Sequence, residues 1–150
     1  MPGMSKKSIM KNYFQNKVII ITGASSGIGL ASAKLFASYG ARLSLAARSL
    51  DKLEAVAKEI GTDNVLCVKT DVSVEADCRN LIEQTVSRFG RIDILVNNAG
   101  LSMRALFRDL DLSVVKSLMD VNFWGTVYCT KFALPYLLEA KGSVVGVISI

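Results

Sequence analysis

Short apolar runs alternate with stretches of helical periodicity along almost the whole chain. The first run, KVIIIT at residues 17–22, is rich in β-branched side chains, which is typical of a strand covered on both faces. From residue 28 to 39 apolar side chains recur at helical spacing, and Gly40 follows where a left-handed helix cap is common. The pattern therefore predicts a strand, a glycine-containing loop and a helix, in that order.

The same cycle repeats through the rest of the chain. The pattern predicts further strands at residues 41–47, 64–70 and 143–150, and a strand that runs into a turn at residues 92–100. It predicts helices at residues 51–60 and 74–89 and a long helical region at about residues 112–140. Such alternation indicates right-handed crossovers and a parallel sheet with helices on both faces. We therefore predict a doubly wound α/β fold with five strands, after a polar lead-in at residues 1–16. Ligands of such sheets bind outside the carboxyl ends of the strands, where the strand order reverses.

The composition is that of one globular domain. The 150 residues are 51% hydrophobic and 21% charged, which is too apolar for a disordered chain. The net charge of +5 is spread among interleaved acidic and basic residues, so it suits an anionic cofactor better than a nucleic acid. The chain has no His, and Cys67, Cys78 and Cys129 have neither disulfide nor zinc spacing. We expect no metal, no nucleic acid and no membrane partner, and a reducing, cytoplasmic setting.

The loop after the first predicted strand reads ITGASSGIG and carries three glycines. A helix that begins just after a strand exposes free N–H groups and a positive dipole end, so it stabilises a phosphate. Gly23 allows a tight turn, Gly27 allows close approach to a pyrophosphate, and Gly29 allows the helix to pack on the sheet. Ser25 and Ser26 add hydroxyl donors. Turn formation alone is the alternative, but a place at the first strand-to-helix junction favours a dinucleotide.

Two motifs resemble one enzyme family. TGASSGIG, from Thr22 to Gly29, resembles the TGxxxGxG cofactor loop of the short-chain dehydrogenases/reductases. NNAG, from Asn97 to Gly100, resembles the turn after the fourth strand of that family. The order of predicted elements also matches from about residue 16 to residue 150. The resemblance implies a Rossmann-type dinucleotide-binding domain at residues 17–150, incomplete at its carboxyl end.

The resemblance also implies the other walls of the cofactor site. Asp71 and Val72 would flank the adenine ring, and Asn98 with the backbone of Ala99 and Gly100 would line the adenosine ribose. Turn formation is again the alternative, since Asp and Asn stabilise turns through local hydrogen bonds. The full set of predicted cofactor contacts is Gly23, Ser25, Ser26, Gly27, Ile28, Gly29, Arg48, Asp71, Val72, Asn98, Ala99 and Gly100.

The end of the second predicted strand indicates which dinucleotide is bound. It reads AARS, with Arg48 after two alanines. An acid at this place commonly accepts the ribose hydroxyls of NAD, whereas a basic side chain accommodates the 2′-phosphate of NADP. The guanidinium fork of Arg48 suits a phosphate, so we predict NADP(H) rather than NAD(H). A solvated arginine at a helix start is the alternative, and Ser26 stands where NADP-binding relatives often carry a second basic residue.

Reduction of a carbonyl requires a hydride, a hydrogen-bond donor to the carbonyl oxygen and an acid. In the resembled family an Asn, a Ser and a Tyr-x-x-x-Lys supply the protein groups. Asn122, in DVNFWGT, matches the helix Asn that supports a proton-relay water, and its apolar neighbours argue against simple exposure. Ser149, in VVGVISI, matches the strand-end serine that hydrogen-bonds the substrate, although a buried serine bonded to backbone is an alternative.

No Tyr-x-x-x-Lys follows the fifth predicted strand. The literal match from Tyr13 to Lys17 precedes the cofactor loop, so we treat it as a coincidence. In the resembled family the Tyr, the Lys and the last strands come after the fifth strand. We therefore expect the chain to be a fragment of a longer protein, inactive on its own, with a free edge on its fifth strand.

The leading hypothesis is an NADP(H)-dependent short-chain oxidoreductase that interconverts a secondary alcohol and a ketone on a small or medium, largely apolar substrate. Residues 101–111 would border the substrate mouth, or form a solvated loop. We expect the full-length protein to be a homo-dimer or homo-tetramer. The alternatives are a non-catalytic NADP(H)-sensing regulator and an interaction module, and a Tyr-x-x-x-Lys beyond Ile150 would favour the enzyme.

Overall fold

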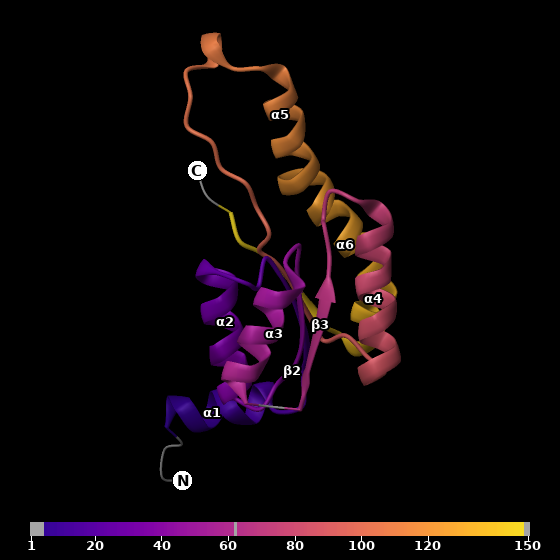
Figure 1. Cartoon of the computed structure of the whole chain (residues 1–150). Coiled ribbons are helices and arrows are strands. Elements are labelled where there is room, and N and C mark those ends of the chain that lie inside the picture. The colour runs from indigo at the N-terminus through magenta and orange to yellow at the C-terminus, as the bar shows by residue number, and fades with distance from the viewer. Residues whose placement is uncertain (1–4, 62, 149–150) are drawn as a thin grey trace.

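The computed structural model describes residues 5–61 and 63–148, and its core is a parallel five-stranded sheet between two layers of helices (Figure 1). The strands are Val18–Thr22 (β1), Arg42–Ala47 (β2), Val65–Lys69 (β3), Ile94–Asn97 (β4) and Ser143–Gly146 (β5). Their order in the sheet is β3-β2-β1-β4-β5, and each neighbouring pair is parallel. The strand order therefore reverses between β1 and β4. The doubly wound α/β fold predicted from the sequence is confirmed.

The helices follow the sequence prediction closely over most of the chain. They are Lys6–Phe14 (α1), Gly27–Ser38 (α2), Leu50–Ile60 (α3), Glu75–Phe89 (α4), Leu112–Met119 (α5) and Gly125–Ala140 (α6). A short 3₁₀ turn at Phe107–Asp109 (η1) and a π-helical segment at Asp120–Trp124 (η2) complete the set. Each of α2, α3 and α4 begins and ends within one residue of its predicted bounds.

Some details of the predicted elements differ in the structure. The long helical region predicted at residues 112–140 contains η2 in its middle, where the N–H of Gly125 bonds to the carbonyl of Asp120 in the wider i→i+5 pattern. The fourth strand is limited to Ile94–Asn97, and the fifth ends at Gly146. The polar lead-in contains α1, whose first turn is capped by the Ser5 hydroxyl, an acceptor from the N–H of Ser8.

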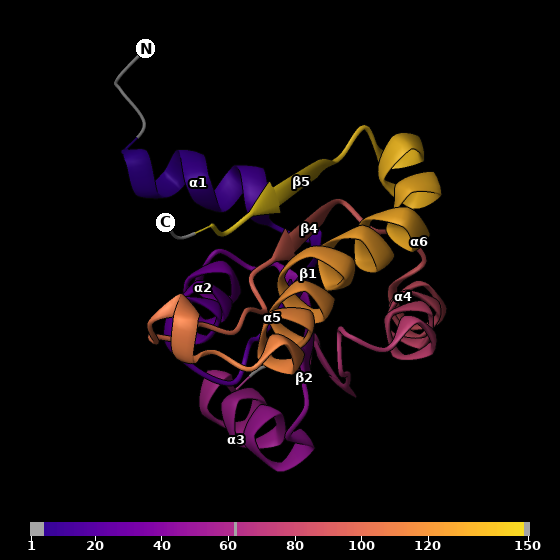
Figure 2. The same ribbon diagram turned by 90° about the horizontal axis from the view of Figure 1, so that it is seen from above.

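Alternate residues of β1 face the two helical layers. Ile20 packs in the cluster under α4 and α6, whereas Ile19 and Ile21 pack in the cluster under α2 and α3. Figure 2 shows these two pairs of helices on opposite sides of the strands. All five residues of β1 are buried, which is the pattern of a central parallel strand covered on both faces. This packing places the carboxyl end of β1 in the middle of the row formed by the carboxyl ends of the five strands.

At the amino ends of the strands, a buried carboxylate joins β1 to the segment before β4. Asp93 precedes β4 and is 2% exposed. One of its oxygens accepts the N–H of Val18 at 2.9 Å, and Arg91 donates to both oxygens at 2.9 and 2.6 Å. Lys17 lies 3.7 Å from the same carboxylate. Asp93 therefore joins the start of β1 to the start of β4, away from the carboxyl ends of the strands.

Candidate functional site

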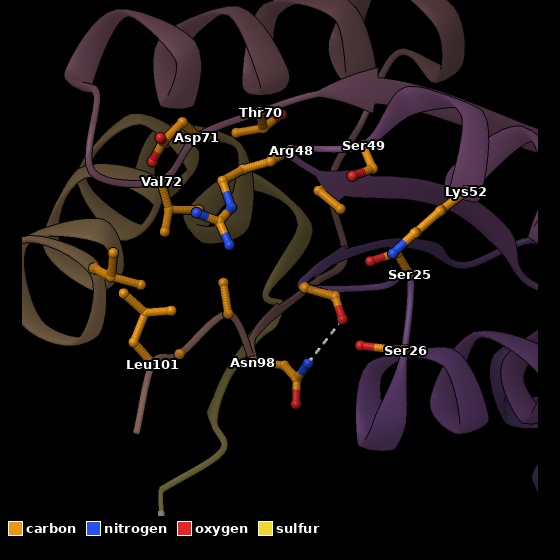
Figure 3. Close-up of a pocket in the computed structure, with 15 residues that line it drawn as sticks. Ser25, Ser26, Arg48, Ser49, Lys52, Thr70, Asp71, Val72, Asn98 and Leu101 are labelled. Carbon is orange, nitrogen blue, oxygen red and sulfur yellow. Dashed lines mark hydrogen bonds between the residues drawn. The ribbon is translucent and has the colours of Figure 1, made fainter. Parts of the chain in front are cut away.

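A cavity of about 350 Å³ opens at the carboxyl ends of the strands, where the strand order reverses (Figure 3). Such switch points are where doubly wound sheets bind their ligands. Its walls come from the loops after β1, β2, β3 and β4, together with Val121 of η2. Of the predicted cofactor contacts, the cavity is lined by Gly23, Ser25, Ser26, Arg48, Asp71, Val72, Asn98, Ala99 and Gly100. The predicted contacts Gly27, Ile28 and Gly29 are not among the lining residues.

The glycine loop leaves backbone open at the start of α2. Gly23 and Gly27 adopt left-handed conformations with φ of +64° and +55°, which favour glycine. A side chain at Gly27 would meet nothing within 4 Å, so its surroundings have room for a ligand. The N-cap Ser26 makes no side-chain cap bond, and the first N–H groups of a helix have no partner inside it. This arrangement can accept a phosphate group.

Gly29 serves the packing of the loop against the sheet. A Cβ added there would overlap the carbonyl oxygen of Gly23 and would lie 2.6 Å from the amide nitrogen of Asn98. Only glycine lets the first turn of α2 lie this close to β1. The adjacent Ile28 is 62% exposed, and its side chain is not part of the cavity wall.

Thr22 and Asn98 join the two motifs across the switch point. The hydroxyl of Thr22 accepts the N–H of Asn98 at 3.0 Å and the N–H of Ala99 at 2.9 Å. The side-chain amide of Asn98 donates to the carbonyl of Thr22 at 3.1 Å. It also donates to the carbonyl of Gly23 at 3.2 Å, the bond drawn in Figure 3. Asn98 therefore positions the glycine loop rather than only its own turn. We did not single out Thr22 as a site residue, because its partners lie 76 and 77 residues further along the chain.

The wall after β2 is basic. Arg48 and Lys52 both line the cavity and are exposed. Within residues 5–61 and 63–148 neither side chain forms an ion pair. Ser49, between them, is the N-cap of α3 and makes no side-chain cap bond. The sequence indicated Arg48 alone, since the position of Lys52 depends on how α3 leaves β2.

The wall after β3 is held by hydrogen bonds from its own turn and from α4. Asp71 accepts the N–H of Ser73 at 3.0 Å and its hydroxyl at 2.6 Å. The N–H of Asp71 donates to the Asp77 carboxylate at 2.8 Å. Val72 is 7% exposed, and its carbonyl accepts the Cys78 thiol at 3.3 Å. Asp71 and Val72 thus lie together in the cavity wall, with the Asp71 carboxylate already hydrogen-bonded.

Asn122 lies beside the cavity but is not sheltered as predicted. Its side-chain oxygen accepts the N–H of Leu101 and its amide donates to the carbonyl of Leu101, each at 2.8 Å. This pair of bonds ties η2 to the residues after the NNAG turn. Asn122 is nevertheless exposed, because its neighbours Phe123 and Trp124 are themselves 50% and 44% exposed. The other predicted catalytic residue, Ser149, lies outside the described residues.

The segment at residues 101–111 extends away from the sheet in Figure 1. Residues 101–109 are all exposed, with Leu106 at 61% and Phe107 at 78%. Arg108 pairs with the adjacent Asp109 at 3.5 Å. Asp111 caps α5, and hydrogen bonds from the side chain and the backbone N–H of Ser113 hold the pKa of its carboxyl below the usual value.

The described part of the chain contains neither a metal-binding cluster nor a membrane-spanning helix. There, no group of three or more His, Cys, Asp or Glu is arranged to hold a metal ion. None of the described helices has both the length and the apolar character needed to cross a membrane.

The sequence profile of the short chain dehydrogenase family matches residues 17–150. The chain is 44% identical over 146 residues to 11-beta-hydroxysteroid dehydrogenase 1A of Arabidopsis thaliana, covering 95% of this chain and 42% of that protein. It is 47% identical over 133 residues to 11-beta-hydroxysteroid dehydrogenase A of Sesamum indicum, covering 86% of this chain and 38% of that protein. The chain therefore spans less than half the length of these curated relatives.

Solved structures of similar fold include enzymes with bound dinucleotides. An alcohol dehydrogenase from the archaeon Thermococcus sibiricus, complexed with 5-hydroxy-NADP, has a TM-score of 0.84 and 33% identity, over 88% of this chain and 57% of that one. A 3-ketoacyl-(acyl-carrier-protein) reductase from Brucella melitensis, complexed with NADH, has a TM-score of 0.85 and 37% identity, over 91% of this chain and 58% of that one. The profile match, these likenesses and the glycine loop at the switch point together show that the chain belongs to the short-chain dehydrogenase family.

Proposed function

We propose that the chain carries the cofactor-binding portion of an NADP(H)-dependent oxidoreductase that interconverts a secondary alcohol and a ketone. The observation that carries the proposal is the cavity at the switch point, with an open glycine loop on one wall and, on another, Arg48, which forms no ion pair with any described residue. A nicotinamide dinucleotide, when bound, supplies or accepts the hydride. The residues of this chain bind it and fix its orientation.

The shape and donors of the cavity fit such a cofactor. The first turn of α2 would hold the pyrophosphate through its free N–H groups, with Ser25 and Ser26 as hydroxyl donors. The half-buried wall at Asp71 and Val72 would take the adenine. The Asp71 carboxylate is already bonded to Ser73, so it is less repulsive toward an anionic ligand than a free carboxylate would be.

Arg48 supports NADP(H) over NAD(H). One similar structure was solved with 5-hydroxy-NADP and another with NADH, so family membership leaves the choice to residues at the end of β2. That position is occupied by a cation with no ion-pair partner in the described part of the chain. A guanidinium there offers paired N–H donors to a 2′-phosphate.

A largely apolar alcohol or ketone is the proposed substrate. The curated relatives are named 11-beta-hydroxysteroid dehydrogenases, and Leu106 and Phe107 expose apolar surface on the segment after the NNAG turn. Asn122 would position that segment and support a proton-relay water, and Ser149 would hydrogen-bond the substrate. Both roles rest on the family resemblance.

We also propose that the full-length protein is a cytoplasmic homo-dimer or homo-tetramer. The apolar side chains of α5, η2 and α6 that remain exposed support an oligomer, since such patches commonly mark interfaces. They include Leu112 at 66%, Phe123 at 50% and Leu138 at 69% exposed.

The test uses the full-length protein, with NADPH and NADH titrated separately and their oxidation followed over a panel of ketones. We expect tighter binding of NADPH, and an Arg48→Gln change should weaken NADPH by about tenfold or more, since hydrogen bonds to charged groups contribute roughly 1.5–3 kcal/mol. The dissociation constant of NADH for this variant should stay within about twofold of the wild-type value. Equal binding of both cofactors by the wild type would refute the NADP(H) assignment. Binding without turnover on any ketone would favour a non-catalytic sensor.

A further inference from the structure

The first turn of α3 brings a second cation to the wall of the cofactor cavity. Lys52 lines the cavity together with Arg48, Ser49 and Ser25. Figure 3 shows the side chains of Arg48 and Lys52 entering the same opening, with the tip of Lys52 directed toward Ser25 of the glycine loop. Arg48 precedes the N-cap of α3, whereas Lys52 lies in the first turn of that helix.

No acidic side chain in the described part of the chain forms an ion pair with either cation, Arg48 or Lys52. The acidic residue in the lining, Asp71, is bonded to the N–H and hydroxyl of Ser73. Asp51 is adjacent to Lys52 in the helix, and neighbours at i and i+1 do not face each other. Two like charges held on one wall are stabilised when an anion lies between them.

The helix alone gives no reason for a lysine at this position. Ser49 is the N-cap of α3, so Lys52 is the third residue of its first turn. The positive end of the helix dipole disfavours a cation there and favours an acid. Ser49 in turn makes no side-chain cap bond, although capping is the usual role of such a serine. Lys52 departs from what helix stability favours, and such departures are expected where a site requires them.

We infer that Lys52 and Ser49 complete, with Arg48, a two-cation subsite for the 2′-phosphate of NADP(H), so that Lys52 is a further determinant of cofactor specificity. The inference rests on the proposed NADP(H) function. The guanidinium of Arg48 supplies a planar pair of donors, and the ammonium of Lys52 supplies a point charge. The Ser49 hydroxyl is free to donate to the phosphate. Lys52 thereby takes the place of a basic residue in the glycine loop, where this chain has Ser26.

The test measures the dissociation constants of NADPH and NADH for the full-length protein and three variants. Lys52→Gln should weaken NADPH by about fivefold to tenfold and leave NADH within about twofold, because only NADPH carries the phosphate. Lys52→Arg should retain most of the NADPH affinity. The control is Lys58→Gln, the same change of charge on the exposed last turn of α3, which should change neither constant.

A stability measurement separates lost recognition from lost folding. Without cofactor, Lys52→Gln should melt at the same temperature as the wild type or slightly higher, because a cation is removed from the amino end of α3. With saturating NADPH, the rise in melting temperature should be smaller for Lys52→Gln than for the wild type. A variant that melts lower without cofactor would contradict the argument from the helix dipole.

The outcomes distinguish failure of this inference from failure of the proposed function. If the wild type does not prefer NADPH to NADH, the NADP(H) assignment is wrong and the inference falls with it. If the wild type prefers NADPH but Lys52→Gln weakens both cofactors equally, or neither, the role of Lys52 is overturned while the proposed function stands. The role of Lys52 would also be overturned if Lys58→Gln lost as much NADPH affinity as Lys52→Gln. A general effect of net charge would then explain the loss in both variants.

Discussion

A single hydroxyl joins the two sequence motifs of the site. Thr22 is 2% exposed, and its hydroxyl accepts two backbone N–H groups of the NNAG turn. The glycine loop after β1 and the turn after β4 are therefore held in one arrangement by a residue that touches no part of the open cavity. Its role is to position backbone on both sides of the switch point.

Replacement of Thr22 by valine should destabilise the protein and loosen the site. Thr22→Val keeps the shape but removes the acceptor, so the N–H groups of Asn98 and Ala99 lose their partner. Leaving buried donors unsatisfied costs about 1–3 kcal/mol, so urea should unfold this variant at a lower concentration. Thr22→Ser keeps the hydroxyl and should lose less. Equal stability of the two variants would mean that these bonds contribute nothing net.

At the scale of elements, the start of α6 packs against Val72, a residue of the cavity wall. A Cβ added at Gly125 would lie 2.7 Å from Cγ2 of Val72 and 3.1 Å from its carbonyl oxygen. One turn later Cys129 meets Cys78 of α4, and the hydrogen bond between the thiols, together with burial, raises the pKa of Cys129 well above its usual value. The same hydrogen bond lowers the pKa of the Cys78 thiol. Val72 is held in place by both helices.

A methyl group at Gly125 should push Val72 toward the cavity. Overpacking of this kind costs roughly 1–3 kcal/mol, although alanine is otherwise the better helix former by about 1 kcal/mol. We expect Gly125→Ala to lower the urea midpoint and to weaken NADPH and NADH alike, because the wall at Val72 is proposed to contact the adenine, which both cofactors carry. Gly61→Ala is the control, since a Cβ there meets nothing within 4 Å and only the φ of +65° is strained. Unchanged binding in Gly125→Ala would show that Val72 does not contact the cofactor.

The elements that the sequence predicted are those with local signals. The β-branched run of β1 and the helical spacing of α2 stand in the printed residues themselves. The π-helical segment at Asp120–Trp124 does not, because DVNFWGT continues a helical pattern. Its form accompanies contacts distant in sequence: Asn122 binds Leu101, and Gly125 packs on Val72.

The residues of the site also divide into those with a local sequence signal and those without one. The glycine loop and the NNAG turn were predicted because each is a contiguous motif placed at a strand end. Thr22, Ser49 and Lys52 were missed because their positions depend on the register of β1 beside β4 and on the direction of α3. The exposure of Asn122 was also unpredictable from its apolar neighbours, since Phe123 and Trp124 face outward in the described chain.

At the scale of the whole molecule, the carboxyl ends and the amino ends of the strands have separate roles. The cavity occupies the carboxyl ends of the strands, and the buried cluster around Asp93 occupies the amino ends of β1 and β4. Between these two ends, apolar side chains pack against both faces of the sheet. A change at Asp93 should therefore alter the stability of the fold without altering the contacts offered to a cofactor.

Asp93→Ala tests this separation. The change leaves the N–H of Val18 without its side-chain acceptor and removes the partner of Arg91 and Lys17. Since Arg91 is 51% exposed and can be hydrated, the cost should lie near the roughly 1–3 kcal/mol of an unsatisfied buried donor rather than near the larger cost of an isolated buried charge. Asp93→Asn, which keeps an acceptor, should lose less. The NADPH dissociation constant, measured on the folded protein at low temperature, should stay within about twofold in both variants. A specific loss of NADPH affinity in Asp93→Ala would show that the two ends of the sheet are coupled through β1, and the division of tasks would then be wrong.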